Sequence, residues 1–348
     1  MGYTYHLPKG RDPLGCNYIE WETTEVLDFM EYRKNMKILV ATEKPFAKKA
    51  LDGIKEILQA AGYEVALLEK YTEKEQLIEA VKDVDGLIVR SDKVTAEVIE
   101  AAEQLKIVVR AGAGFDNVDL KAASARDIVV MNTPGQNSNP VAELALAMMI
   151  YMSRNRFTPG TGMELQGKTV GIHAYGNVGR LVARKAKALG MNVLAFDPFV
   201  TDNALFENDG VEQVGTVEEL YAGSDFLSLH IPATDATRKS IGYKLMMSMP
   251  KGATLVNTAR KEVIDEVGLE AAMTERTDLK YVTDIAPDDE ATMRAMFGNR
   301  FFATPKKMGA ETAEANINAG LAAARQIVGY FEKGECRFQV NKKPCGCK

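Results

Sequence analysis

The sequence predicts an α/β protein built from two doubly wound parallel-sheet domains. Three observations lead to this fold class. Short runs of apolar, often β-branched residues alternate with helical stretches from residue 36 onward, which is the pattern of parallel strands joined by helices. A glycine-containing turn at residues 174–179 connects one such run to a helix near the middle of the chain. A length of 348 residues suits more than one domain.

The first half of the chain carries the alternation most clearly. We expect strands over residues 36–41, 63–68, 86–90, 106–112 and 127–131, and helices over 48–61, 73–81 and 96–104. Pro134-Gly135 then interrupts the pattern, as Pro and Gly pairs do. A long apolar helix over 141–153 and a turn-rich connection lead into the second half.

The turn at 174–179 has the spacing of a pyrophosphate-binding loop, although Ala174 replaces its first glycine. Gly176 lets the backbone approach a diphosphate, and Gly179 lets the helix pack closely on the strand. The N-terminus of that helix points N–H groups at the anion. Asp197 ends the next strand, where a carboxylate accepts from the adenosine ribose hydroxyls. The segment predicts a Rossmann domain that binds NAD through the following residues: Tyr175, Gly176, Asn177, Val178, Gly179 and Asp197.

The second half continues the alternation and suggests how the domains are divided. We expect strands at 225–230, 253–258, 278–284 and 300–304, followed by an alanine-rich helix over 310–332 that returns to the first domain. The expected parts are an N-terminal extension (1–35), a discontinuous flavodoxin-like substrate-binding domain (36–138 and 308–340), the inserted Rossmann domain (139–307) and a tail (341–348).

Composition and charge argue against several classes of partner. A formal net charge of −5 gives no reason to expect binding to nucleic acid or to an anionic membrane. The longest apolar run, 142–152, contains Glu143 and is too short to span a bilayer. The N-terminal residues lack the apolar core of a signal peptide. The four cysteines suggest a reducing compartment, so we expect a cytoplasmic protein. Cys336, Cys345 and Cys347 lack an accompanying His or paired Cys motif, and we expect no metal.

In this order of motifs the chain resembles the D-2-hydroxyacid dehydrogenase family over nearly all of residues 36–340. The stretch 89–150 carries most of the likeness, and SLHIPAT, LVNTARKEVID and ATPKKMGAETAEA follow in the family's order. These features resemble the branch that oxidises 3-phosphoglycerate to 3-phosphohydroxypyruvate at the start of serine biosynthesis, in a short form without a regulatory C-terminal domain. The resemblance implies an NAD-dependent oxidoreductase and a homodimer, with the 141–153 helix as part of its interface.

Hydride transfer between a C2 hydroxyl and nicotinamide requires a cation on the substrate and a proton shuttle. Arg260 follows an expected strand, where a guanidinium can hold the carboxylate and the keto oxygen, and the resemblance assigns it this role. The family usually has a histidine after a Thr-Pro pair, but Lys306 and Lys307 stand there. If the family's histidine position is counted forward from Thr304-Pro305, it falls on Lys306, whereas if it is counted back from Gly309, it falls on Lys307. We prefer Lys307, because the glycine spacing fixes the loop.

The resemblance also implies an acidic residue that orients the proton shuttle. Asp289 stands at the family's glutamate position and Glu290 one residue further, and pairing with either would raise the pKa of a lysine. By the same resemblance, Asp284 accepts from the nicotinamide carboxamide. The other cofactor-lining positions that it implies are His230, Ile231, Pro232, Thr258 and Ala259.

Polar groups at the expected strand ends of the first domain are candidates to bind a small anion such as 3-phosphoglycerate. Two converging arginines would form a phosphate or carboxylate clamp, and backbone N–H groups of a glycine-containing turn could assist them. The candidate substrate-binding residues are Arg90, Ser91, Arg110, Ala113, Gly114 and Asn117.

Two other functions are compatible with these residues. A glyoxylate or hydroxypyruvate reductase would use the same chemistry on an unphosphorylated substrate. A non-catalytic, NAD-sensing protein resembling a corepressor would account for the absent histidine. Arg260 and both lysines remain where hydride-transfer chemistry needs them, and we therefore favour an enzyme.

Overall fold

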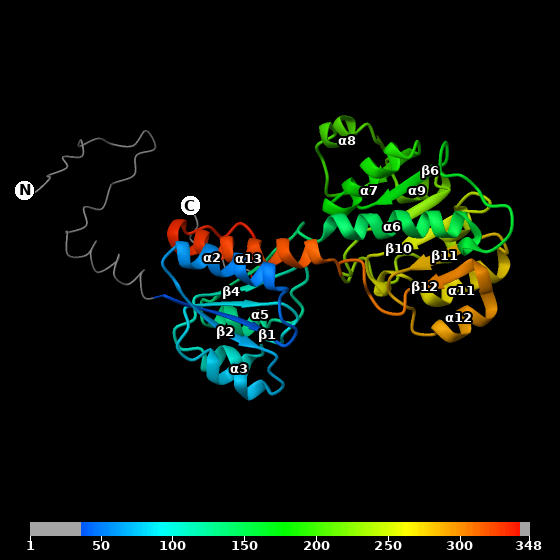
Figure 1. Cartoon of the computed structure of the whole chain (residues 1–348). Helices are drawn as coiled ribbons and strands as arrows, with labels where there is room; N and C mark the ends of the chain where they lie inside the picture. The colour runs from blue at the N-terminus through cyan, green and yellow to red at the C-terminus, as the bar shows by residue number, and fades with distance from the viewer. Residues whose placement is uncertain (1–35, 342–348) are drawn as a thin grey trace, which may run out of the picture.

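The computed structural model describes residues 36–341, which form two lobes, each built around a parallel sheet (Figure 1). The expected extension 1–35 and nearly all of the expected tail, including Cys345 and Cys347, lie outside the described residues. The first sheet has five strands in the order β2-β1-β3-β4-β5. Its elements are β1 (Lys37–Thr42), α2 (Lys48–Ala60), β2 (Glu64–Glu69), α3 (Lys74–Ala80), β3 (Gly86–Val89), α4 (Ala96–Ala101), β4 (Ile107–Arg110), α5 (Leu120–Ala125) and β5 (Val129–Asn132).

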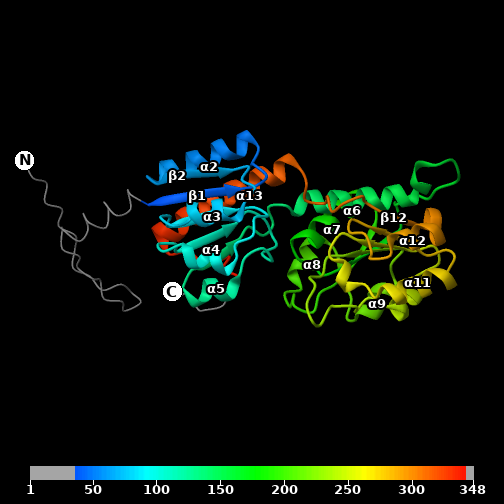
Figure 2. The same ribbon diagram turned by 90° about the horizontal axis from the view of Figure 1, so that it is seen from below.

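The last helix, α13 (Ala313–Lys333), returns to this first sheet and lies beside α2 in both views (Figures 1 and 2). Its buried face, which includes Ala323 and Ile327, packs with Ile38 and Ile54 in one apolar cluster. A Cβ on Gly320 would meet Ile54 at 2.9 Å, so glycine there allows the two helices to pack closely. The chain therefore crosses between the lobes twice, near residues 133–137 and 304–312.

The second sheet has seven strands in the order β12-β11-β10-β9-β6-β7-β8, and all its pairings are parallel. The strand order reverses direction beside β6, and open α/β sheets bind ligands at such a switch point. The elements are α6 (Ser138–Ser153), η1 (Asn155–Phe157), β6 (Thr169–His173), α7 (Asn177–Ala188), β7 (Asn192–Phe196), α8 (Ala204–Asp209), β8 (Glu212–Gln213), α9 (Val217–Ala222), β9 (Phe226–Leu229), α10 (Tyr243–Ser248), β10 (Thr254–Asn257), η2 (Lys261–Val263), α11 (Glu266–Glu275), β11 (Lys280–Thr283), α12 (Glu290–Phe297), η3 (Gly298–Arg300) and β12 (Phe301–Ala303).

The fold class expected from the sequence is confirmed, with small differences at element ends. Strand β3 ends one residue before the expected limit of 90, and α6 begins at Ser138, three residues earlier than expected. Pro140 lies in the first turn of α6, where a missing N–H removes no intrahelical hydrogen bond. Helix α6 packs against α7, β10 and β11 and so belongs to the core of the second lobe.

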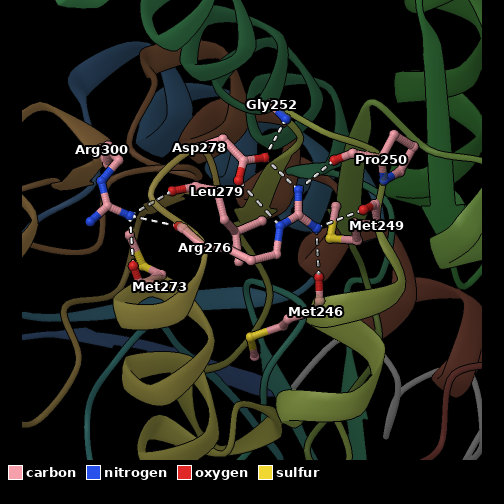
Figure 3. A network of polar contacts seen from close by, with 9 residues as sticks. All are labelled: Met246, Met249, Pro250, Gly252, Met273, Arg276, Asp278, Leu279 and Arg300. Atoms are coloured by element: carbon pink, nitrogen blue, oxygen red, sulfur yellow. Dashed lines mark hydrogen bonds and ion pairs between the residues drawn. The ribbon is translucent and has the colours of Figure 1, made fainter.

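An arginine network joins the loops that precede β10 and β11 (Figure 3). The Arg276 guanidinium donates to the carbonyls of Met249 and Pro250 at 2.6 and 2.8 Å, and it forms an ion pair with Asp278. Asp278 also accepts from the backbone N–H of Gly252 at 2.6 Å. These contacts lower the pKa of Asp278 from 3.8 to about 2, with the Arg276 hydrogen bond as the largest cause. The network lies at the amino-terminal edge of the sheet, away from the strand ends where ligands bind.

We predict that Asp278→Asn destabilises the protein in a pH-dependent way. A pKa lowered on folding stabilises the protein above the unfolded-state value and loses that contribution as pH falls through the folded-state value. Urea unfolding near neutral pH should show a loss of roughly 2 kcal/mol, and the gap to wild type should shrink towards pH 3. A gap that stays constant with pH would mean that the Asp278 charge contributes no stability.

Candidate active site

The glycine turn between β6 and α7 leaves room for a bound group. Nothing lies within 4 Å of a Cβ added at Gly176, which precedes α7, whereas a Cβ at Gly179 would meet the Ala174 carbonyl oxygen at 2.2 Å. Gly176 and Asn177 are exposed at the N-terminus of a 12-residue helix, the arrangement that binds diphosphates. Ala174, at the family's first glycine position, has a φ of 80°. The turn thus keeps a backbone conformation that favours glycine.

Asp197 fixes the shape of this turn from the end of β7. Its carboxylate accepts from the backbone N–H groups of Tyr175 and Phe199 at 2.8 and 2.9 Å. The Tyr175 ring is buried, stacks on Phe206 and donates its hydroxyl to Asp209 at 2.8 Å. Tyr175 therefore faces a ligand only through its backbone. Each oxygen of Asp197 retains acceptor capacity for ribose hydroxyls.

Buried polar atoms without partners mark the continuation of this site along the strand ends. Within residues 36–341, His230 Nε2 after β9 and Thr258 Oγ1 after β10 have no hydrogen-bond partner. Ile231 is buried beside His230, and Pro232 is exposed. Buried polar groups are normally satisfied, so orphaned ones commonly mark a ligand position. Burial, followed by the neighbouring His173, lowers the pKa of His230 to about 3. His230 is therefore neutral at physiological pH and suits a cofactor contact better than acid–base work.

Arg260 is presented by a turn that Asn257 holds. The buried Asn257 side chain accepts from Ala259 N–H at 3.0 Å and donates to the Arg260 carbonyl at 3.0 Å. The Arg260 guanidinium donates to the Ala259 carbonyl at 2.8 Å. Lys261, where the family usually has glycine, forms an exposed ion pair with Asp288.

The lysine-bearing segment is anchored by Asp284, which is 1% exposed. Its carboxylate accepts from the Thr304 hydroxyl at 3.0 Å, from Met308 N–H at 2.9 Å and from Gly309 N–H at 2.8 Å. A Cβ on Gly309 would approach Asp284 to 2.8 Å, so the segment closes on the carboxylate only with glycine there. This anchor uses three of the acceptor positions that a carboxylate offers.

Of the two candidate lysines, Lys307 is the one whose surroundings shift its pKa. Desolvation lowers the pKa of Lys307 from 10.5, the Arg260 charge lowers it further, and Asp284, Glu262 and Asp116 oppose both effects. By its accessible surface Lys307 is an exposed residue, as Lys306 is.

The two carboxylates that we expected to orient the lysine have other partners. Asp289 caps α12 by accepting from Thr292 N–H at 3.3 Å, and Glu290 pairs with Arg294 one turn along that helix. The acidic groups that act on Lys307 come instead from the strand end at Asp284, from η2 and from the opposite lobe. Neither Asp289 nor Glu290 is among the groups that shift the pKa of Lys307, and their assignment to the proton shuttle stays a prediction.

Arg110 stands at the end of β4 in the first lobe. Burial lowers the pKa of Arg110, and the charges of Arg90 and Arg260 lower it further, so the Arg260 charge acts across the lobes. We call the region between Arg110 and Arg260 the cleft. The Arg110 side chain lies over Gly112, where an added Cβ would come within 1.6 Å of Nη1. Its Nε donates to the Arg90 carbonyl at 2.9 Å, and the Asn117 amide donates to the same carbonyl at 3.3 Å.

The remaining first-lobe candidates lie around these side chains. Ser91 is exposed, Ala113 and Gly114 are half-buried, and the Ala113 carbonyl accepts from Asn132. The Arg90 guanidinium donates to Asn316 at 2.6 Å and to the carbonyls of Lys44 and Pro45, so much of its hydrogen-bonding capacity is used within the lobe.

Comparison with known proteins identifies the family. Residues 144–306 match the model described as "D-isomer specific 2-hydroxyacid dehydrogenase, NAD binding domain". The chain is 36% identical over 282 residues to the hydroxypyruvate reductase of Thermotoga maritima, covering 76% of this chain and 90% of that protein. The chain belongs to the D-isomer specific 2-hydroxyacid dehydrogenase family. As a member it is an NAD-dependent oxidoreductase, and the open glycine turn, Asp197 and the unpartnered His230 and Thr258 suit that cofactor.

Two further relatives carry a more specific description. A solved 3-phosphoglycerate dehydrogenase of Entamoeba histolytica with NAD⁺ bound is 52% identical, with a TM-score of 0.78, over 88% of this chain and 99% of that one. The D-3-phosphoglycerate dehydrogenase of Methanocaldococcus jannaschii is 39% identical over 311 residues, which are 84% of this chain and 58% of that protein. The chain thus spans little more than half of that relative.

The described part of the chain contains neither a membrane-spanning helix nor a metal-binding cluster. Residues 36–341 contain no helix long and apolar enough to cross a membrane. The same residues contain no cluster of three or more His, Cys, Asp or Glu side chains that could hold a metal ion.

Sequence reasoning missed three residues that shape the site. Asn257 precedes Thr-Ala-Arg directly, and Asn side chains commonly bond to backbone two residues on, so this signal was available. Glu262 and Asp116 reach Lys307 from elements far apart in sequence, and no local spacing could have paired them with it.

We predict that Gly112→Ala weakens binding of the acid substrate while leaving the cofactor site intact. The new methyl group would displace the Arg110 guanidinium, and KM for the 2-oxo acid should rise roughly tenfold or more, as expected for a lost charge-assisted hydrogen bond. Gly62→Ala is the matched control, because Gly62 also has a positive φ of 85° but nothing lies within 4 Å of its added Cβ. Equal KM values in the two variants would contradict the arrangement.

Proposed function

We propose that this chain oxidises 3-phospho-D-glycerate to 3-phosphohydroxypyruvate with NAD⁺. The observation that carries the proposal is that the Arg260 charge acts both on Lys307 in its own lobe and on Arg110 in the other lobe. A cleft lined by several cations suits a substrate with both a carboxylate and a phosphate. The similarity to proteins named as phosphoglycerate dehydrogenases supports the same substrate. The relative named hydroxypyruvate reductase supports the unphosphorylated substrate as the alternative.

The proposed mechanism assigns Arg260 to the substrate oxygen and Lys307 to the proton. In the oxidation direction the neutral Lys307 amine accepts the proton of the C2 hydroxyl, while Arg260 stabilises the negative charge on that oxygen. The turn at Gly176 and Asp197 would hold NAD⁺, whose nicotinamide would supply the acceptor for the C2 hydride. In the reduction direction the Lys307 ammonium donates its proton to the same oxygen as the C–H bond forms.

A lysine can serve this purpose only if its neutral form is accessible. Desolvation and the Arg260 charge both lower the pKa of Lys307 below 10.5, because each disfavours the ammonium. The opposing carboxylates of Asp284, Glu262 and Asp116 keep the protonated form available for reduction. These opposing influences on the pKa suit a group that must accept a proton during oxidation and donate one during reduction.

The substrate is tested by NADH oxidation with 3-phosphohydroxypyruvate, hydroxypyruvate and glyoxylate in parallel. We expect the highest kcat/KM for the phosphorylated acid, by roughly tenfold or more, because a phosphate adds charge-assisted hydrogen bonds. A higher value for hydroxypyruvate or glyoxylate would reject the phosphorylated substrate in favour of the alternative. Turnover of none of the three acids would support the non-catalytic function.

The proton shuttle is tested with Lys307→Ala, for which we expect kcat to fall by about 10²–10⁴ with NADH affinity kept. Lys306→Ala is the neighbouring control and should have a much smaller effect. Oxidation by wild type should increase with pH along a limb below the ordinary lysine value of 10.5, since the neutral amine is the reactive form. Lys307→Ala should lose that limb.

The mechanism fails if both single variants and the double variant retain near wild-type turnover. A larger loss for Lys306→Ala than for Lys307→Ala would move the role to the neighbouring lysine.

A further inference from the structure

Asp92 is a buried carboxylate in the first lobe that forms no ion pair within residues 36–341. It is 3% exposed. It accepts from Glu43 N–H at 2.6 Å, from the Tyr71 hydroxyl at 2.9 Å and from Arg90 N–H at 3.0 Å. A buried charge is costly unless its hydrogen bonds are satisfied, and these three donors satisfy it. They follow β1, β2 and β3, so one carboxylate joins the ends of three neighbouring strands.

The turn that Asp92 fixes is the one that orients the cleft side chains. The Arg90 carbonyl accepts from Arg110 Nε at 2.9 Å and from the Asn117 amide at 3.3 Å. The Asp92 carbonyl accepts from the same Asn117 amide at 2.7 Å. The direction of the Arg110 guanidinium therefore depends on where the backbone of residues 90–92 lies.

The side chain of Arg90 holds the same region from its other side. Its guanidinium donates to the Lys44 and Pro45 carbonyls at 3.2 and 3.4 Å and lies over the Phe46 ring at 5.3 Å. Asp92 binds the backbone of Glu43 just before this segment. The 43–46 loop and the 90–92 turn are thus held together by two sets of contacts, those of the Arg90 guanidinium and those of the buried Asp92 carboxylate.

We propose that Asp92 is a positioning residue for substrate binding. It holds the 90–92 turn, and through the carbonyls of that turn it directs Arg110 and Asn117 towards the acid in the cleft, without touching the substrate itself. This inference rests on the proposed function only in that the cleft between Arg110 and Arg260 receives an anionic 2-oxo acid. It does not depend on the presence of a phosphate.

Asp85 provides a matched comparison for a purely structural role. It is also buried, at 6% exposed, and it accepts from Lys37 N–H at 2.9 Å. It stands before β3 rather than after it, at the amino-terminal edge of the same sheet. Asp85→Asn therefore removes a buried carboxylate from the same lobe without reaching the cleft.

The experiment measures steady-state reduction by the full chain carrying Asp92→Asn or Asp85→Asn, with whichever of 3-phosphohydroxypyruvate, hydroxypyruvate and glyoxylate wild type reduces best. Asparagine keeps the size of Asp92 but turns one acceptor oxygen into a donor that faces N–H groups. We expect KM for the acid to rise roughly tenfold or more in Asp92→Asn, as for other lost hydrogen bonds to charged groups. Asp85→Asn should leave KM within about twofold of wild type, a margin inside ordinary non-additivity.

Two further measurements separate positioning from loss of fold. NADH affinity, followed by nucleotide fluorescence, should be unchanged in Asp92→Asn, because the Rossmann lobe is untouched. Tyr71→Phe removes one donor and keeps the carboxylate, and its KM should lie between those of wild type and Asp92→Asn. Melting temperatures of all variants report the structural contribution.

The proposal is overturned if Asp92→Asn has a wild-type KM, or if Asp85→Asn raises KM equally. A preference of wild type for an unphosphorylated acid would reject the proposed substrate but would leave this comparison intact, because the same variants are then measured with that acid.

Discussion

The cleft depends on carboxylates that stand just after strands and accept backbone N–H donors. Asp92, Asp197 and Asp284 follow β3, β7 and β11 respectively, and each accepts from at least two donors supplied by neighbouring loops. Parallel strands deliver many loops to one edge of a sheet, and each loop carries N–H groups that the ladder cannot pair. A short acidic side chain satisfies several of them at once and fixes the loop in doing so. The functional side chains are then carried by loops of defined shape.

The electrostatics of the site follow from bringing two such edges together. Arg110 belongs to one lobe, while Arg260 and Lys307 belong to the other, and their like charges disfavour one another in a partly desolvated cleft. That mutual repulsion is compensated when an anion enters, because each cation then gains a partner. Desolvation, followed by the repulsion from Arg260, lowers the pKa of Lys307 and makes its ammonium easier to deprotonate than that of a free lysine. Substrate affinity and acid–base chemistry thus arise from one set of charges.

Periodicity was sufficient to predict the fold, and the individual cofactor-binding residues expected at the glycine turn stay a prediction. Strand–helix alternation predicted both sheets, and the spacing from Gly176 to Asp197 predicted a turn whose parts are contiguous in sequence. The surroundings of Lys307 could not be predicted in this way, because Asp116 and Glu262 approach it from separate elements. Asp289 and Glu290 were assigned to the proton shuttle by counting residues, but Asp289 caps the N-terminus of α12 and Glu290 lies in its first turn. Arg90 was expected to face the substrate, yet Asn316, more than 200 residues away, binds its guanidinium.

The return of α13 to the first lobe has a mechanical consequence. Because the chain crosses between the lobes twice, any rotation of one lobe against the other must be absorbed by torsion angles in those two crossings. In the second crossing, Met308 and Gly309 are held by Asp284, and Gly309 lies against Val141 and Leu144 of α6. Between Gly309 and α13 the described backbone hydrogen bonds are local: Glu311 N–H donates to the Met308 carbonyl at 2.9 Å and Thr312 N–H to the Ala310 carbonyl at 3.1 Å. Lys307 precedes these residues and lies in the segment that Asp284 holds, so its placement beside Arg260 does not depend on the torsion angles between Gly309 and α13.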